Sequence, residues 1–204
     1  MKRKDQILHT ATTLFASRGY SQLSMAELAK LTGVAQGTIF YHFNSKEHLF
    51  QIILERFKAE LTEAFDACGG DDGAANGLEA LIERVKAYFD IVGKMEEQFL
   101  LLHRHDAYEI ASDNPECLKL LEGIYSDIIG FFETAIAAGQ KDGSIDQRPA
   151  GKSAMIVFTM VDGLVRLNTY GIYQAGALYE DFIDSVCRVV ANTSSEGGKG
   201  NPCR

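Results

Sequence analysis

The chain has 204 residues, 46% of them apolar and 24% charged, which is enough apolar material for a folded core and excludes a disordered polymer. No apolar run approaches the roughly 20 residues that span a bilayer. The N-terminus also lacks the pattern of a secretory signal, so we expect a cytoplasmic protein. Four scattered cysteines without a C-x-x-C pair argue against structural zinc or a disulfide scaffold and predict reduced thiols.

Charge is distributed unevenly along the chain, whose formal net charge is −8. Residues 1–50 hold six basic and three acidic side chains, a charge of +3, so the remainder carries −11. A basic head on an acidic body would approach a polyanion through the head alone. Charge by itself leaves a chance fluctuation of surface residues equally open.

The first segment has apolar residues at the spacing of one helix face: Ile7, Leu8, Ala11, Leu14 and Phe15. Arg18 places a cation in the last turn of this helix. Gly19 suits a left-handed stop, so the helix is predicted to end near residue 19.

A helix-turn-helix is predicted next. Ser24 and Glu27 have the spacing of a capping box, so a second helix should begin near Met25. A tight turn at Gly33 and a third helix from about Gln36 follow. Ala29, which is small, Gly33 and Ile39 have the relative spacing found in the DNA-binding form of this motif. An ordinary helical hairpin remains the alternative on spacing alone.

The stretch "SMAELAKLTGVAQGTIFYHFNSKEHLF" resembles the DNA-binding signature of the tetracycline-repressor (TetR) family of bacterial transcription regulators. The resemblance covers about the first 50 residues, whereas over residues 51–204 it is only architectural. One departure is Ala35, a position that is often serine in the family. The third helix therefore lacks a side-chain cap, which typically costs about 1 kcal/mol.

The resemblance implies that the third helix enters the major groove of DNA. Gln36 would pair with a base, Gly37 would permit close approach and Thr38 completes the first turn. Tyr41 and His42 are expected to contact phosphates. The full set of predicted DNA-binding residues is Ser24, Gln36, Gly37, Thr38, Tyr41, His42 and Lys46.

The rings beside these contacts should be buried, with Phe40 and Phe43 facing a small core that includes Phe15 and Ile39. The alternative places the whole aromatic cluster in the core. Asn44 or Ser45 should cap the fourth helix, whose N-terminal amides and Lys46 suit one phosphate. A plain cap with a solvated lysine is the alternative.

The rest of the chain also reads as helical, so the fold class is all-α. Apolar residues step by four from Leu49 to Phe65, before the glycine-rich linker "CGGDDGAANG". Further helical periodicity covers residues 78–92, 99–110, 118–138, 154–170 and 178–190. We predict a DNA-binding domain over 1–48, a ligand-binding and dimerisation domain over 49–193, and a disordered tail over 194–204.

The second domain is predicted to bind a small, apolar or aromatic effector. Its candidate ligand residues are Phe89, Phe99, His103, Asp106, Tyr125, Phe131 and Phe158. A divalent metal is the second choice, but His103 and His105 would lie on nearly opposite faces of one regular helix. We therefore expect no metal site and no cofactor.

By resemblance, the last two helices should pair with their copies in a second chain, and Gly163, Gly171 and Gly176 would allow close approach. The predicted function is a homodimeric repressor that binds an inverted-repeat operator and is released by its effector. No catalytic motif or phosphate loop is present, so we do not expect an enzyme. The alternatives are an all-α enzyme or ligand carrier with a vestigial helix-turn-helix, and a protein interaction module.

Overall fold

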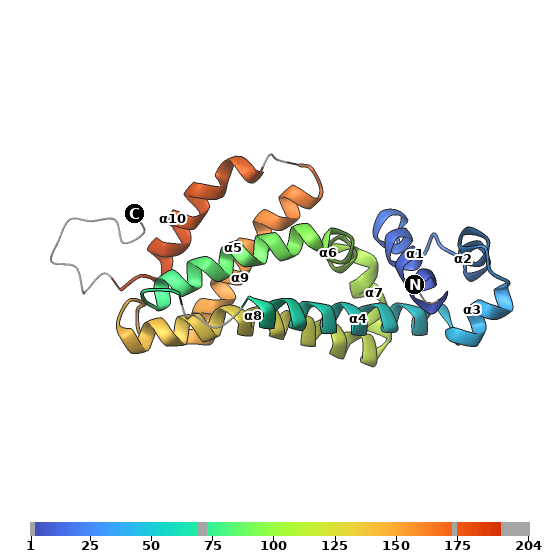
Figure 1. The fold of residues 1–204 in the computed structure, drawn as a ribbon, viewed down its shortest axis with the longest axis horizontal. Coiled ribbons are helices and arrows are strands. Elements are labelled where there is room, and N and C mark those ends of the chain that lie inside the picture. The colour runs from blue at the N-terminus through green and yellow to red at the C-terminus, as the bar shows by residue number, and fades with distance from the viewer. Residues whose placement is uncertain (1–2, 69–72, 173–174, 193–204) are drawn as a thin grey trace. The chain divides into compact units, whose positions relative to one another are not determined.

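The computed structural model describes residues 3–68, 73–172 and 175–192, and within these ranges the chain is helical and has no β-strand (Figure 1). The all-α prediction is therefore confirmed. No helix in this part of the chain is both long and apolar enough to cross a membrane. The predicted tail lies outside the described residues.

The elements are, in chain order, α1 (Arg3–Arg18), α2 (Met25–Thr32), α3 (Gln36–His42), α4 (Lys46–Ala67), α5 (Gly77–Lys94), α6 (Glu96–His103), α7 (His105–Asp113), α8 (Pro115–Asp142), α9 (Ala150–Thr169), the 3-10 helix η1 (Ala175–Leu178) and α10 (Tyr179–Val190).

The helices form two compact units. The first comprises residues 1–62 and 95–124, and the second comprises residues 63–94 and 125–204. The long helices α4 and α8 each contribute to both units. The division predicted at residue 48 concerns which part binds DNA, and it stays a prediction.

In the first unit α1 packs against α2 and α6, and α2 packs against α3. The apolar face of α1 is buried as its spacing predicted, with Ile7, Ala11 and Phe15 completely inaccessible. Further along the unit, the Phe57 ring of α4 meets the Phe99 ring of α6 edge to face at 5.3 Å. The DNA-binding motif is thus one part of a larger helical core.

In the second unit α5 packs against α9 and α10. The Tyr88 ring of α5 and the Phe132 ring of α8 are both buried and meet edge to face at 5.6 Å. At its start, α5 approaches the last turns of α8 so closely that only glycine fits. A Cβ on Gly77 would lie 2.1 Å from the backbone nitrogen of Gly139.

One expectation about the helices is wrong. The segment expected as one helix over residues 99–110 is interrupted at Arg104, whose extended backbone (φ −72, ψ 144) ends α6 and begins α7. Among the described cysteines, Cys68 and Cys117 are free thiols, in line with the predicted reduced state.

Replacing Gly77 with alanine should lower the free energy of unfolding by about 3 kcal/mol, because the added methyl group meets main-chain atoms that cannot rotate away. Denaturant unfolding measures this change. The matched control is Gly93→Ala in the same helix, where an added Cβ meets nothing within 4 Å. That substitution should stabilise the protein by about 0.5 to 1 kcal/mol through helix propensity. Equal effects at both positions would contradict the packing explanation.

Candidate functional site

The turn between α2 and α3 is built by local chemistry. Ser24 caps α2, since its hydroxyl accepts a hydrogen bond from the Glu27 backbone nitrogen at 3.1 Å. Gly33 adopts φ 68, and Val34 N donates to the Ala29 carbonyl at 3.0 Å, which closes the helix in a Schellman motif. The predicted start of α2 and the role of Gly33 are therefore confirmed. The Glu27 side chain does not complete the capping box but pairs with Arg18 at 3.0 Å.

Helix α3 buries one side and exposes the other. Ile39 and the adjoining Phe43 are completely buried, as is Phe15 of α1. The predicted contact residues Gln36 and Gly37 are exposed on the first turn, and Thr38 is half-buried. An added Cβ on Gly37 would meet nothing within 4 Å, so the helix surface there is open to close approach. As the sequence indicated, Ala35 provides no side-chain cap.

The rings at the end of α3 divide differently from the prediction. Tyr41 is 84% exposed and His42 is half-buried beside it, so both are available to a ligand. Phe40, expected in the core, is instead 43% exposed. At 100° per residue, Phe40 cannot share the inward direction of Ile39, which takes the buried position.

The start of α4 is capped by Ser45, whose Oγ accepts from His48 N at 3.0 Å. Lys46 does not extend freely into solvent: its Nζ lies 4.1 Å from the centre of the Tyr20 ring. Burial lowers the pKa of Lys46, while the nearby carboxylates of Glu47 and Asp106 oppose that shift. A phosphate contact by Lys46 stays a prediction, and it would compete with this ring contact.

Tyr20, in the loop after α1, is a residue that the sequence did not single out. Its ring packs against Phe15 and Phe50, with centroids 5.3 and 5.5 Å away. Its hydroxyl donates to Glu47 Oε1 at 3.0 Å. Burial, followed by this hydrogen bond, raises the pKa of Tyr20 above its ordinary value. In the sequence, the available indication of this role was an aromatic residue directly after the glycine that ends α1.

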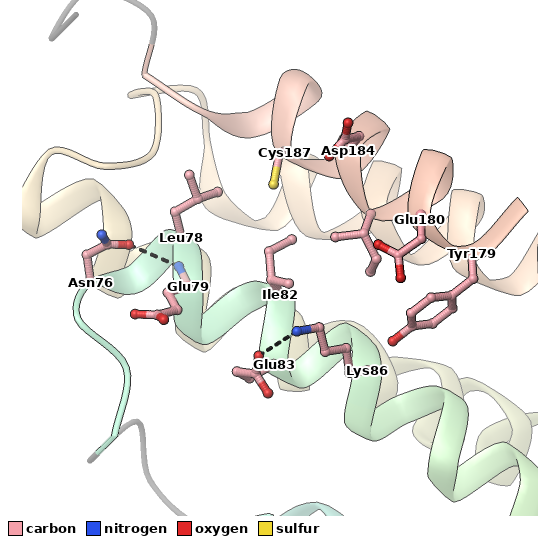
Figure 2. A pocket seen from close by; sticks show the side chains of 11 residues that line it. Asn76, Leu78, Glu79, Ile82, Glu83, Lys86, Tyr179, Glu180, Asp184 and Cys187 are labelled. Atoms are coloured by element: carbon pink, nitrogen blue, oxygen red, sulfur yellow. Dashed lines mark hydrogen bonds and ion pairs between the residues drawn. The ribbon is translucent and has the colours of Figure 1, made fainter. Parts of the chain in front are cut away.

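A pocket of about 470 Å³ lies between α5 and α10 in the second unit (Figure 2). Its walls are Asn76, Leu78, Glu79, Ile82, Glu83, Lys86, Tyr179, Glu180, Ile183, Asp184 and Cys187. Leu78 and Ile82 point from α5 toward α10, and Glu180 points back from α10 into the pocket. The sequence shows the helical spacing of these residues, but it does not show that these faces of α5 and α10 meet.

The pocket lining carries four carboxylates and one ammonium group, a formal charge of −3. Lys86 Nζ pairs with Glu83 at 2.8 Å, which uses the one positive charge within the wall. Glu79 caps its own helix by accepting from Ala75 N. Asp184 lies 3.9 Å from the Arg188 guanidinium on the same helix, so the remaining negative potential is mainly at Glu180.

The predicted ligand residues are distributed over both units, and none of them lines this pocket. Phe99, His103 and Asp106 belong to the first unit, where Phe99 and His103 are buried. In the second unit the Phe131 ring stacks on Phe65 at 4.2 Å, and Tyr125 meets Phe158 at 5.8 Å.

Phe89 meets one residue of the pocket wall, through its edge contact with Tyr179 at 5.7 Å. Ligand binding by this set stays a prediction.

Asp106 has a definite structural partner. Its Oδ2 accepts a hydrogen bond from the Tyr20 backbone nitrogen at 2.6 Å, so the carboxylate is engaged with the loop after α1. His105 is exposed and lies 3.2 Å from Glu109 on the same helix. No group of three or more His, Cys, Asp or Glu side chains in the described part of the chain is arranged to hold a metal ion.

Comparison with known proteins supports the identification of the head. Residues 7–53 match the family described as bacterial regulatory proteins of the tetR family. The chain is 26% identical over 166 residues to the HTH-type transcriptional regulator TtgR of Pseudomonas putida, covering 79% of this chain and 77% of the relative. It is 29% identical over 149 residues to the HTH-type transcriptional repressor KstR2 of Rhodococcus jostii, covering 70% and 67%.

A solved structure has the same fold as this chain. It is a transcriptional regulator from Saccharomonospora viridis in complex with choline, with a TM-score of 0.77 and 23% identity over 92% of this chain and 97% of the other. Fold, helix-turn-helix geometry and matched relatives agree along most of the length. Residues 7–53 therefore carry the signature of the TetR family, and the matched relatives support a TetR-family transcriptional regulator.

Proposed function

We propose that the protein is a homodimeric repressor that binds an inverted-repeat DNA operator and leaves it when a small molecule binds. The exposed side of α3, held in place by buried Ile39 and Phe43, is the observation that carries this function. Relatives that are named as transcriptional repressors support repression. An enzyme or carrier with a vestigial motif is not favoured, because the motif retains the Ser24 cap of α2, the turn at Gly33 and its exposed contact face.

DNA reading is assigned to the exposed residues of α3. The Gln36 amide can donate to and accept from one adenine edge, and Gly37 lets the backbone approach the base pairs. Tyr41 and His42 follow on the same short helix and provide hydrogen bonds to phosphate oxygens. The first turn of α3 would thus determine which bases are bound, and the last turn would determine how the helix is oriented on the DNA.

Dimerisation is assigned to an apolar surface of α9. Met155 and Ile156 are 57% and 44% exposed, and Thr159 and Gly163 continue the same side at helical spacing. An added Cβ on Gly163 would meet nothing within 4 Å, so another backbone can come close there. Exposed apolar side chains grouped on one helix are typical of a protein interface. A second copy satisfies this surface and supplies the second head that an inverted repeat requires.

The effector is assigned to the pocket between α5 and α10, which has the size of a small-molecule site. Its apolar floor suits the apolar compound predicted from the sequence. The net negative lining adds a preference for a positive charge, so an organic cation with an alkyl or aryl group is proposed. The structural neighbour solved with choline supports a ligand of this class.

Selection from random duplexes should yield an inverted repeat, bound by a dimer more tightly than other sequences by at least 1000-fold. The affinity should fall steeply with salt, because phosphate contacts release counterions. Light scattering checks the dimer. Met155→Glu should produce a monomer with weakened operator binding, whereas Glu116→Gln, an exposed change on α8, should not. Salt-independent micromolar binding to every duplex would exclude a sequence-specific regulator.

Substitutions on α3 and α4 should separate base reading from phosphate binding. Gln36→Ala should relax the preference at one base position, by about 1 to 3 kcal/mol. Tyr41→Phe, His42→Ala and Lys46→Ala should weaken binding to all sequences. Titrations against single-base operator variants measure both effects.

Gln51→Ala on α4 is the control for losing a glutamine away from the contact face. The Lys46→Ala variant tests whether Lys46 contacts a phosphate. Loss of such a contact reduces the slope of log affinity against log salt concentration by about 1. A lysine that only supports Tyr20 would leave the slope unchanged. Identical profiles for all four contact variants would refute the division of labour.

An alkyl or aryl ammonium compound should release the operator and raise the melting temperature. The panel also contains neutral aromatic compounds, fatty-acyl anions and divalent metal ions. Glu180→Gln should weaken the response to the cation, whereas Asp181→Asn, a neighbouring exposed carboxylate outside the pocket, should not. Release by a metal ion alone, abolished by His103→Ala, would instead support a metal effector.

A further inference from the structure

Two charged side chains at the junction of α6 and α7 hold the end of α1. Arg104 Nη1 donates to the Ala16 carbonyl oxygen at 3.1 Å, and Asp106 Oδ2 accepts from Tyr20 N at 2.6 Å. The two side chains also approach each other, with 3.5 Å between Arg104 Nε and Asp106 Oδ2. They are only 28% and 23% exposed, so water competes less for these bonds than at an open surface. All of these residues belong to the first unit.

The contact satisfies groups that α1 cannot satisfy itself. The last carbonyls of a helix have no partner within that helix and carry a partial negative charge. Arg104 supplies both a donor and a positive charge there, from 88 positions along the chain. Gly19 makes room for the pair: its φ is 95, and a Cβ would lie 2.6 Å from Asp106 Oδ2.

Tyr20 connects this contact to the start of α4. Its backbone nitrogen is held by Asp106, while its hydroxyl donates to Glu47 and its ring lies under Lys46 Nζ. A movement of the α6–α7 junction would therefore move Tyr20, and Tyr20 would move the N-terminal turn of α4. That turn follows α3 by only three residues.

We propose that Arg104 and Asp106 are positioning residues for DNA binding, which hold the loop at Tyr20 and thereby fix α3 and the start of α4 in the DNA-competent arrangement. The inference rests on the proposed operator binding. Without the pair, only the ring contacts of Tyr20 and its hydrogen bond to Glu47 hold the loop, so it samples more conformations and DNA binding must order it. The contact also gives the α6–α7 junction control over the head.

The test compares Asp106→Asn with Glu109→Gln, which removes the same charge from an exposed position on the same helix. Asp106→Asn should weaken binding to the selected operator about tenfold, because it removes the charge that strengthens the hydrogen bond from Tyr20 N and attracts Arg104. The salt slope should stay unchanged, because no phosphate contact is lost. The Tyr20 amide proton, shifted downfield by its carboxylate partner, should move upfield in the NMR spectrum. Glu109→Gln should alter neither affinity nor the Tyr20 resonance.

Thermal unfolding of each variant shows whether it is folded at the temperature of the assay. If Asp106→Asn does not fold, Arg104→Lys keeps the charge but loses the forked donors, and it should weaken binding less in the same direction. Operator binding within twofold of the unchanged protein, with the Tyr20 resonance shifted, would overturn the positioning role. If the unchanged protein binds no duplex specifically, the proposed function fails, and this inference fails with it.

Discussion

Three aromatic rings hold the DNA-binding head together. Phe15 near the end of α1, Tyr20 in the loop and Phe50 in α4 lie 5.3 to 5.9 Å apart, centroid to centroid. Ring pairs of this kind are worth about 0.5 to 1.5 kcal/mol each beyond their burial. They join the end of α1 and the loop after it to α4, which lies about 30 residues later in the chain. Because α2 and α3 are too short to be stable alone, their arrangement depends on packing, α2 against α1 and α3 against α2.

Helix α3 has little intrinsic stability, and this follows from its sequence. It has seven residues, glycine at its second position and no side-chain cap at Ala35. Two buried side chains, Ile39 and Phe43, therefore provide most of its anchoring. The residues proposed to read bases lie on the first turn, at the end of the helix away from Phe43 and without a side-chain cap. Whatever fixes the neighbouring loop and α4 consequently has a large effect on how ready the reading surface is.

Local rules predicted much of the head. The cap at Ser24, the left-handed Gly33 and the start of α3 each depend on residues a few positions apart, so the sequence contains the whole cause. The break at Arg104 was missed because no glycine or proline marks it. There the partner is a carbonyl at Ala16, far away in the chain. Phe40 was misplaced for a related reason: adjacent rings compete for one buried direction, and only the packed structure decides between them.

The pocket between α5 and α10 depended even more on tertiary pairing, because two helices each supply half of it. Its chemistry also constrains regulation. To shift the protein from 99:1 to 1:99 between its DNA-binding and released conformations, a ligand must bind the released conformation more tightly by about 5.5 kcal/mol. An exposed ion pair supplies at most about 1 kcal/mol. At about 25 cal/mol per Å², the remainder needs roughly 180 Å² of apolar surface removed from water. If the proposed effector binds here, a carboxylate such as Glu180 can select its cation, while burial of the ligand's own apolar group, together with Leu78 and Ile82 of the lining, must provide most of the energy.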